Sequence, residues 1–134
     1  MSPQVFRELL APPVRELTSQ LSAPWIFHSD GNLYPILDDV LSLGPAGLHP
    51  IEPQCMSLSR LKEQIGRKVC LVGNVDVDIL ARGTARQTRD ETLRCLREGT
   101  ADGGGGYMIS SSNSIPGYAI PENVAAMAAT IRDQ

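Results

Sequence analysis

Short apolar runs alternate along the chain with longer segments whose apolar residues recur at helical spacing. The four apolar runs cover residues 25–27, 46–48, 69–72 and 107–109. Each run is continuous and does not alternate with polar residues, which is typical of strands covered on both faces in a parallel sheet. The pattern therefore predicts four short, parallel β-strands.

The first helical segment begins at a clear start signal. Ser2 and Pro3 form an N-cap and first-turn pair. The apolar stripe that follows consists of Phe6, Leu9, Leu10, Val14, Leu17 and Leu21. Pro12 and Pro13 interrupt this stripe, so we expect a kink or a restart of the helix there.

Five further helices are predicted from spacing and from their end residues. They cover residues 33–41, 58–65, a short stretch from 76, 84–98 and a last stretch from 121. Gly44 and Gly66 are expected as left-handed helix stops. Thr84 and Gln87 have the spacing of a capping box.

The alternation of helix and strand predicts an α/β fold with a parallel sheet and right-handed crossovers. A doubly wound sheet and a part of a (β/α) barrel both fit this order. No flexible linker or abrupt change of composition divides the chain, so we expect residues 1–134 to form a single domain. The four glycines at 103–106 are expected to form a tight loop before the last strand.

Composition excludes several classes of partner. The net charge is −3 and no run of Lys or Arg occurs, which argues against nucleic acid and anionic membranes as partners. The N-terminus has Arg7 and Glu8 where a signal peptide would be apolar. The three cysteines, Cys55, Cys70 and Cys95, have no metal-binding or disulfide spacing, and Cys70 looks like core filling. We expect a cytoplasmic protein with reduced thiols.

Polar side chains follow every predicted strand, whereas the loops that enter the strands contain mostly turn residues such as Pro45 and Gly66. The residues concerned are His28, Asp30 and Asn32 after the first strand, His49 and Glu52 after the second, Asn74 and Asp76 after the third, and Ser112 and Asn113 after the fourth. In parallel α/β folds, binding groups gather at the carboxyl ends of the strands. We therefore predict a substrate-binding pocket formed by His28, Asp30, Asn32, Glu52, Asn74, Asp76, Ser112 and Asn113.

Each of these residues also has a purely structural interpretation. The segment Asp30-Gly31-Asn32 could form a turn that caps the next helix, and Asn74 or Asp76 could cap the short helix from residue 76. A metal site is another alternative, with His28 and Asp30 as ligands and Glu52 or His49 completing it. A serine nucleophile is disfavoured because the chain has no Gly-x-Ser-x-Gly motif.

Five motifs in register give the chain a family resemblance. They are IFHSDGN, GLHPIEP, LVGNVDVDILARGT, GGGYMISSSNSI and PENV. In this order and spacing the chain resembles the uroporphyrinogen decarboxylase superfamily, and within it the branch with cobalamin-dependent methyltransferases. The resemblance implies the C-terminal half of a (β/α)₈ barrel, with four of the eight strands. A full barrel needs about 250 residues.

The resemblance implies two chemistries for the parent protein: decarboxylation of a tetrapyrrole, which is a lyase reaction of porphyrin biosynthesis, or corrinoid-linked methyl transfer. In the decarboxylases a functional histidine follows the last strand, and Asn113 stands at that position here. Zinc-dependent methyltransferases of the family use a His-x-Cys motif, which is His28-x-Asp30 in this chain. A corrinoid or zinc is thus the implied cofactor, and the missing thiolate counts against zinc.

Half a barrel would have two open sheet edges and an inner face without an opposing wall. We expect self-association or pairing with a complementary N-terminal half. The enzyme interpretation requires that half, because in the decarboxylases arginines and an aspartate that bind the substrate come from it. The alternative is a non-catalytic half-barrel that binds a tetrapyrrole or a protein, or that only self-assembles.

Overall fold

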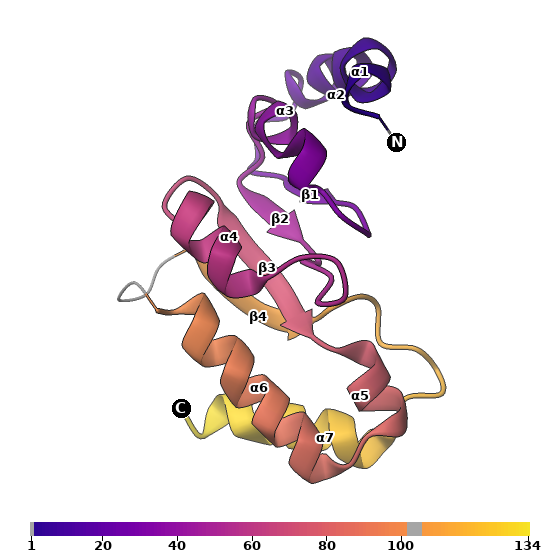
Figure 1. Ribbon diagram of the computed structural model, residues 1–134, viewed down its shortest axis with the longest axis vertical. Helices are drawn as coiled ribbons and strands as arrows, with labels where there is room; N and C mark the ends of the chain where they lie inside the picture. Colours follow the sequence, from indigo (N-terminus) through magenta and orange to yellow (C-terminus); the bar gives the residue numbers. More distant parts are fainter. Residues whose placement is uncertain (1, 102–105) are drawn as a thin grey trace.

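The computed structural model describes residues 2–101 and 106–134 and contains one four-stranded sheet (Figure 1). The strands β1 (Ile26–His28), β2 (Gly47–His49), β3 (Cys70–Val75) and β4 (Tyr107–Ser111) lie in sequence order and are all parallel. The prediction of a parallel four-stranded β/α half-barrel is therefore confirmed. The predicted loop at 103–106 lies outside the described residues, apart from Gly106.

Helices separate the strands in the predicted alternation. They are α1 (Pro3–Val5), a π-helical turn (Phe6–Leu10), α2 (Ala11–Thr18), a 3₁₀ turn (Tyr34–Ile36) with α3 (Leu37–Leu41), α4 (Leu58–Ile65), α5 (Val77–Arg82), α6 (Ala85–Gly99) and α7 (Pro121–Arg132). Ser2 caps α1 and Thr84 forms the capping box of α6 with Gln87, as predicted. None of the described helices is long and apolar enough to cross a bilayer.

The N-terminal helical segment departs from a regular α-helix just before its two prolines. Its turn at Phe6–Leu10 is π-helical, and α2 restarts at Ala11 with a proline in its first turn. Proline has no backbone N–H and its ring crowds the preceding turn, which a wider turn accommodates. The segment contacts the sheet through Phe6, whose ring packs edge-on against Phe27 of β1.

The helices pack on one face of the sheet. Helices α4 and α6 contact β3, and α6 also contacts β4. The main hydrophobic core lies between these layers and includes Leu48, Leu71 and Leu61. Figure 1 shows the resulting arc, with the N-terminal helices at one end and the α6–α7 pair at the other.

The opposite face of the sheet, here called the inner face, has no covering layer among the described residues. An added Cβ on Gly47 would approach Ile26 and Val72, and Val72 pairs in register with Met108, so these side chains share that face. Ile26 is 49% exposed and Met108 is 55% exposed. In a closed barrel such inward side chains fill the interior.

Candidate functional site

The two histidines occupy paired positions at the ends of β1 and β2. His28 and His49 are register partners, and they share the inner face with Ile26 and Gly47, two residues earlier in each strand. Their Nδ1 atoms are 2.7 Å apart, and the ring centroids are 4.7 Å apart. The parallel register of two short strands thus places two imidazoles in direct hydrogen-bond contact.

The tails of β1 and β4 meet beside this pair. Asp30 Oδ1 lies 3.8 Å from His28 Nε2 and accepts a 3.0 Å hydrogen bond from Asn113 Nδ2. Asn113 is 83 positions further along the chain, so this contact depends on the tertiary fold alone. The strand-end group of His28, His49, Asp30 and Asn113 is here called the imidazole cluster.

The surroundings of His49 shift its pKa. Burial lowers the pKa of His49 below its ordinary value, and the neighbouring His28 lowers it further. Asp30 and a hydrogen bond with the backbone of Ser111 act in the opposite direction and are weaker causes. His49 therefore resists taking up a positive charge.

Two other predicted residues fix the loops around the cluster. Glu52 Oε2 accepts a 2.7 Å hydrogen bond from Gly31 N, which ties the β2 tail to the β1 tail. Asn32 Oδ1 accepts a 3.0 Å bond from Tyr34 N at the start of the next helical turn. The turn interpretation of this segment therefore holds for Asn32, while Glu52 connects two strand ends.

Asp76 and Ser112 hold the start of α5. Asp76 is its N-cap and accepts bonds from Asp78 N (2.8 Å) and from Gln54 Nε2 (3.0 Å). Ser112 Oγ accepts a 3.2 Å bond from Val77 N. The capping role proposed for Asp76 is therefore observed.

A small cavity of about 110 Å³ lies next to the imidazole cluster. Its lining combines the tails of three strands: Glu52, Pro53, Gln54, Asp76, Val77, Asp78, Ser112 and Asn113. Asn113 belongs to both the cavity and the imidazole cluster. The strand ends thus form one continuous polar rim from β1 to β4.

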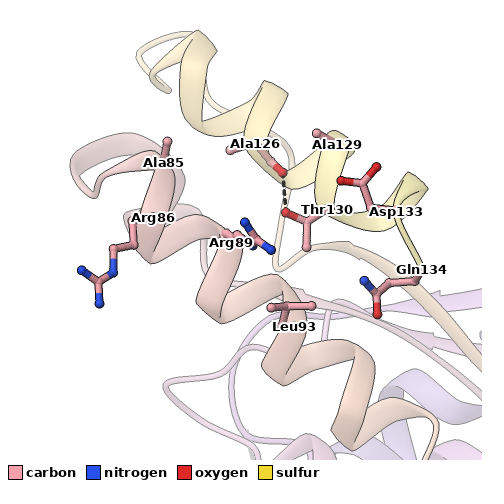
Figure 2. A pocket seen from close by; sticks show the side chains of 9 residues that line it. All are labelled: Ala85, Arg86, Arg89, Leu93, Ala126, Ala129, Thr130, Asp133 and Gln134. Carbon is pink, nitrogen blue, oxygen red and sulfur yellow. Dashed lines mark hydrogen bonds between the residues drawn. The ribbon is translucent and has the colours of Figure 1, made fainter.

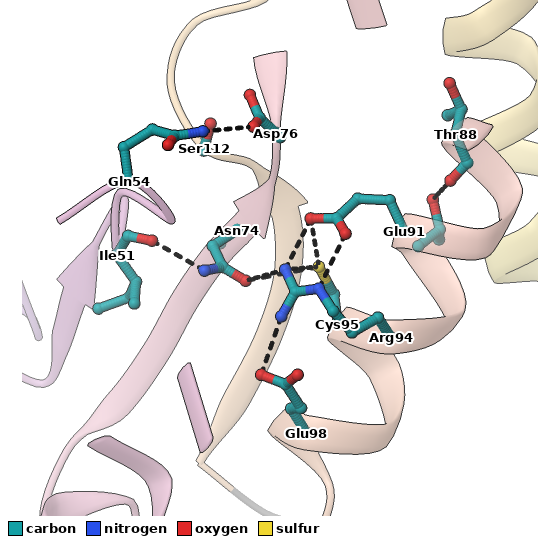
Figure 3. A network of polar contacts seen from close by, with 12 residues as sticks. Ile51, Gln54, Asn74, Asp76, Thr88, Glu91, Arg94, Cys95, Glu98 and Ser112 are labelled. Carbon is teal, nitrogen blue, oxygen red and sulfur yellow. Dashed lines mark hydrogen bonds and ion pairs between the residues drawn. The ribbon is translucent and has the colours of Figure 1, made fainter. Parts of the chain in front are cut away.

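Asn74 does not belong to this rim. Its side chain is buried, donates to Ile51 O (2.9 Å) and faces Arg94 and Cys95 of α6 through its Oδ1 atom (Figure 3). The regular alternation of β3 is interrupted at Gly73, which has φ of 144°. Asn74 therefore points toward the helical layer, and the capping role considered for it is not observed.

Asn74 closes a charged network on α6. Arg94 contacts Glu91 at 2.6 Å and Glu98 at 2.8 Å, and these side chains line a cavity of about 330 Å³ on the helical side of the sheet (Figure 3). The hydrogen bond to Glu91 raises the pKa of Arg94, although burial partly opposes this. Both ion pairs of Arg94 lie within α6, and the contacts of Arg94 and Cys95 with Asn74 Oδ1 join the network to β3.

A third cavity lies in the groove between α6 and α7 (Figure 2). Its volume is about 400 Å³, and its floor is made of small side chains such as Ala85, Ala126 and Ala129. Thr130 Oγ1 bonds within its own helix, to Ala126 O at 2.7 Å. The groove is larger than the rim cavity, but its hydrogen-bonding groups do not converge on a common point, so we assign the site to the rim.

The donor set of the rim does not fit a zinc centre. Within residues 2–101 and 106–134, no group of three or more His, Cys, Asp or Glu side chains is arranged to hold a metal ion. His28 and His49 use their Nδ1 atoms on each other, and Cys95 is buried behind β3. The metal alternative built on His28 and Asp30 therefore lacks the ligand set that zinc requires.

Six of the eight predicted site residues lie at the rim, and the other two do not. His28, Asp30 and Asn113 lie together, and Glu52, Asp76 and Ser112 line the adjoining cavity. Asn32 supports a turn, and Asn74 faces the helices. The prediction did not include His49 among the substrate-binding residues, although its position directly after the second apolar run matches that of His28 after the first.

Comparison with known proteins identifies relatives of the chain. A family model described as uroporphyrinogen decarboxylase (URO-D) matches residues 1–134. A curated relative, the methylated-thiol–coenzyme M methyltransferase of Methanosarcina mazei, is 26% identical over 101 residues, which is 75% of this chain and 27% of the relative.

A solved structure gives the same picture. A methyltransferase from Methanosarcina mazei superposes with a TM-score of 0.83 and 29% sequence identity, over 99% of this chain and 38% of that one. The chain thus spans between a quarter and two fifths of the length of these relatives.

Proposed function

Because the chain belongs to the uroporphyrinogen decarboxylase (URO-D) family, we propose that it forms part of a larger barrel whose strand-end rim binds a small substrate during methyl transfer. The observation that supports this most directly is the imidazole cluster, which joins the ends of β1, β2 and β4 at the rim. In barrels of this type, the reacting groups lie at that end of the strands.

Methyl transfer is favoured over decarboxylation by two observations. Both relatives are methyltransferases, and one is named for a methylated thiol as its substrate. In the decarboxylase pattern a histidine follows the last strand, whereas Asn113 stands there and is engaged with Asp30. We accordingly propose a small methylated compound as the methyl donor.

The rim residues have separate roles in this proposal. His28 and Asp30 contact the substrate, since their side chains are 50% and 59% exposed. Asn113 fixes the Asp30 carboxylate, and Glu52 fixes the backbone of Gly31 beside it. The cavity at Asp76 and Ser112 extends the site toward α5.

A corrinoid is the cofactor that we propose for the whole protein. His28 and Asp30 would face the group, since their side chains are 50% and 59% exposed at the rim. When bound, a corrinoid carries the methyl group. For zinc the ligand set is missing, and we propose no zinc-dependent step.

Ligand binding can be measured through Trp25, the single tryptophan, which directly precedes β1. A corrinoid or a porphyrin that lies at the rim quenches its emission by energy transfer. We expect methylcobalamin to quench Trp25 and the Asp30→Asn variant to bind it more weakly. Quenching by coproporphyrin alone would favour the decarboxylase alternative, and quenching by neither ligand would favour the non-catalytic half-barrel.

A further inference from the structure

Strands β1 and β4 are the two edges of the described sheet. Within the described residues, each of them pairs with a neighbouring strand on one side only. The four strands are parallel and follow one another in sequence order, so a second copy related by a twofold axis along the centre of the arc has its strands parallel to the first. Such a copy brings its β1 to β4 and its β4 to β1. One partner therefore satisfies both edges.

Two four-stranded sheets also supply the strand number and the stagger of a (β/α)₈ barrel. A ladder of paired residues followed once around such a barrel returns about eight residues from its starting point. Within one copy the ladder leads from Ile26 through Gly47 to Cys70. On β4 it reaches Gly106, since the next residues of β3 and β4 are paired. The stagger therefore arises at the two junctions between copies, with about four residues at each by symmetry.

The positions of the strands fix the direction of the stagger. A displacement of about four residues from Gly106 leads either to Ser110 or to a position before β4. Only Ser110 lies in a strand that can pair, so Ile26 of the partner subunit lies opposite Ser110. Both side chains belong to the inner face, because Ser110 follows Met108 by two residues.

This register completes the layers that fill a barrel interior. Each layer of a (β/α)₈ barrel consists of about four side chains from alternate strands, and the stagger amounts to about one residue per strand. Ile26 of β1 therefore shares a level with Val72 of β3. Gly47 of β2 shares the level below with Met108 of β4, where the missing side chain of the glycine leaves room for the methionine. One copy supplies two members of each layer, and a twofold partner supplies the same two again.

The same register makes the substrate-binding rim a structure shared by both copies. Two residues beyond the pair of Ile26 and Ser110, Ser112 of each copy lies opposite His28 of the partner subunit. In one copy the tail of β1 has the tail of β2 beside it on one side only. The β4 tail of the second copy supplies the neighbour on the other side, so the rim of a single copy is incomplete.

We propose that two copies of the chain close one eight-stranded barrel, in which β4 of each copy pairs with β1 of the other and Ser110 lies opposite Ile26 of the partner subunit. The inference rests on the proposed function, because it specifies the second half of the barrel whose rim binds the substrate. That rim contains two imidazole clusters related by the twofold axis, and Ser112 of each copy borders the cluster of the other. Ile26 and Met108, which are 49% and 55% exposed in one copy, become interior side chains.

Disulfide formation between two single variants tests the junction. Neighbouring strands lie about 4.8 Å apart, which is within the Cα separation that a disulfide spans. The Ile26→Cys and Ser110→Cys proteins are unfolded together in urea, refolded as a mixture and exposed to oxidised glutathione without any ligand. Mass spectrometry of the linked peptides then identifies the pair, apart from any linkage through the natural cysteines. We expect the disulfide between positions 26 and 110 as the main product.

Tyr118→Cys is the matched control for Ser110→Cys, because Tyr118 is 73% exposed and lies beyond the end of β4. We expect its mixture with Ile26→Cys to give little linked product. Equal yields from the two mixtures would contradict the pairing of β4 with β1 of another copy. Efficient linkage of Ile26→Cys to itself would also overturn the proposal, since it requires two β1 edges to meet.

Light scattering of the wild-type chain distinguishes a closed barrel from an open assembly and needs no variant. We expect twice the mass of one chain. Species that grow with concentration would show that the edges pair without closing, and the proposal would fail. A monomer that forms a one-to-one complex with a separately expressed N-terminal half of the Methanosarcina mazei methyltransferase would assign the edges to such a half, and the proposal would fail as well.

None of these measurements includes a ligand. Absence of the disulfide between positions 26 and 110 refutes the two-copy barrel, whereas a linked dimer in which no ligand quenches Trp25 refutes the proposed substrate binding. Failure of the proposed function and failure of this inference are therefore separate results.

Discussion

The contacts that individual side chains make at the strand ends depend on the face of the sheet on which they lie. His28 and His49 lie on the inner face and meet each other, whereas Asn74, four residues after the start of β3, is turned toward α6. There it is part of a buried environment that includes Cys95. Burial raises the pKa of Cys95 to about 12, and the nearby Glu91 adds to this effect.

The Cys95 thiol therefore makes stability depend on alkaline pH. The pKa of Cys95 is higher in the folded chain than in the unfolded chain. The stability that the protonated thiol contributes is therefore fully present below pH 9 and is lost as the pH rises toward 12. From the size of this shift the loss is on the order of 2–4 kcal/mol. We expect urea unfolding between these pH values to show a steeper loss of stability in the wild type than in Cys95→Ala. Parallel pH profiles of the two proteins would argue against this burial.

At the scale of elements, the contact between α6 and β4 depends on one glycine. A Cβ on Gly99 would lie 2.3 Å from the ring of Tyr107, whose hydroxyl is itself fixed by a 2.6 Å bond to Gly73 O. Alanine has the higher intrinsic helix propensity. At Gly99 this gain in helix propensity is outweighed by the clash with Tyr107, because the ring cannot move without losing its hydrogen bond to Gly73 O.

We expect Gly99→Ala to destabilise the chain by about 1–3 kcal/mol, the usual cost of overpacking. Gly117→Ala is the matched control, since an added Cβ there meets nothing within 4 Å. Thermal or urea unfolding of both variants measures the difference. A Gly99→Ala protein as stable as the control would show that β4 and α6 are not held in this contact.

The sequence predicted the positions of the helices and strands better than it predicted which of their faces are buried. Apolar runs, the Ser2 cap and the Thr84 capping box each depend on local chemistry, and the strands and helices appear where these signals place them. Gly44 has the expected left-handed φ of 80°, but Gly66 is right-handed because the chain makes another turn before β3.

What local patterns could not predict are the contacts between distant segments. Leu17 and Leu21 fit the apolar stripe of the first helix, yet they are exposed because α2 ends at Thr18 and no described element covers that face. Cys70 is only partly buried, since it faces the uncovered inner side. The bonds of Asn113 to Asp30 and of Asn74 to α6 join residues 20 to 83 positions apart.

At the scale of the whole molecule, no described element covers the inner face, and β1 and β4 are the edge strands of the described sheet. Ile26 and Met108 present apolar surface that a barrel would fill with the side chains of further strands. Sheet edges with unpaired backbone groups are sites of association. The missing layer can be supplied by an N-terminal half or by a second copy of the chain.

We expect the chain alone to self-associate, as measured by size-exclusion chromatography with light scattering. Met108→Gln should weaken the association and reduce binding of an apolar dye. Leu9→Gln is the control, because Leu9 is also exposed but lies on the N-terminal helical segment. A stable monomer at dilute concentration that binds no dye would contradict the half-barrel account.

We infer that the tails of the four parallel strands form one ligand-binding rim. A ¹H–¹⁵N amide map of the chain titrated with methylcobalamin tests it most directly. We expect shifts at residues 28–32, 49–52, 76–78 and 111–113, with the α6–α7 groove unchanged. Shifts centred on Arg89, Ala126 and Ala129 in that groove, with the strand tails silent, would contradict it.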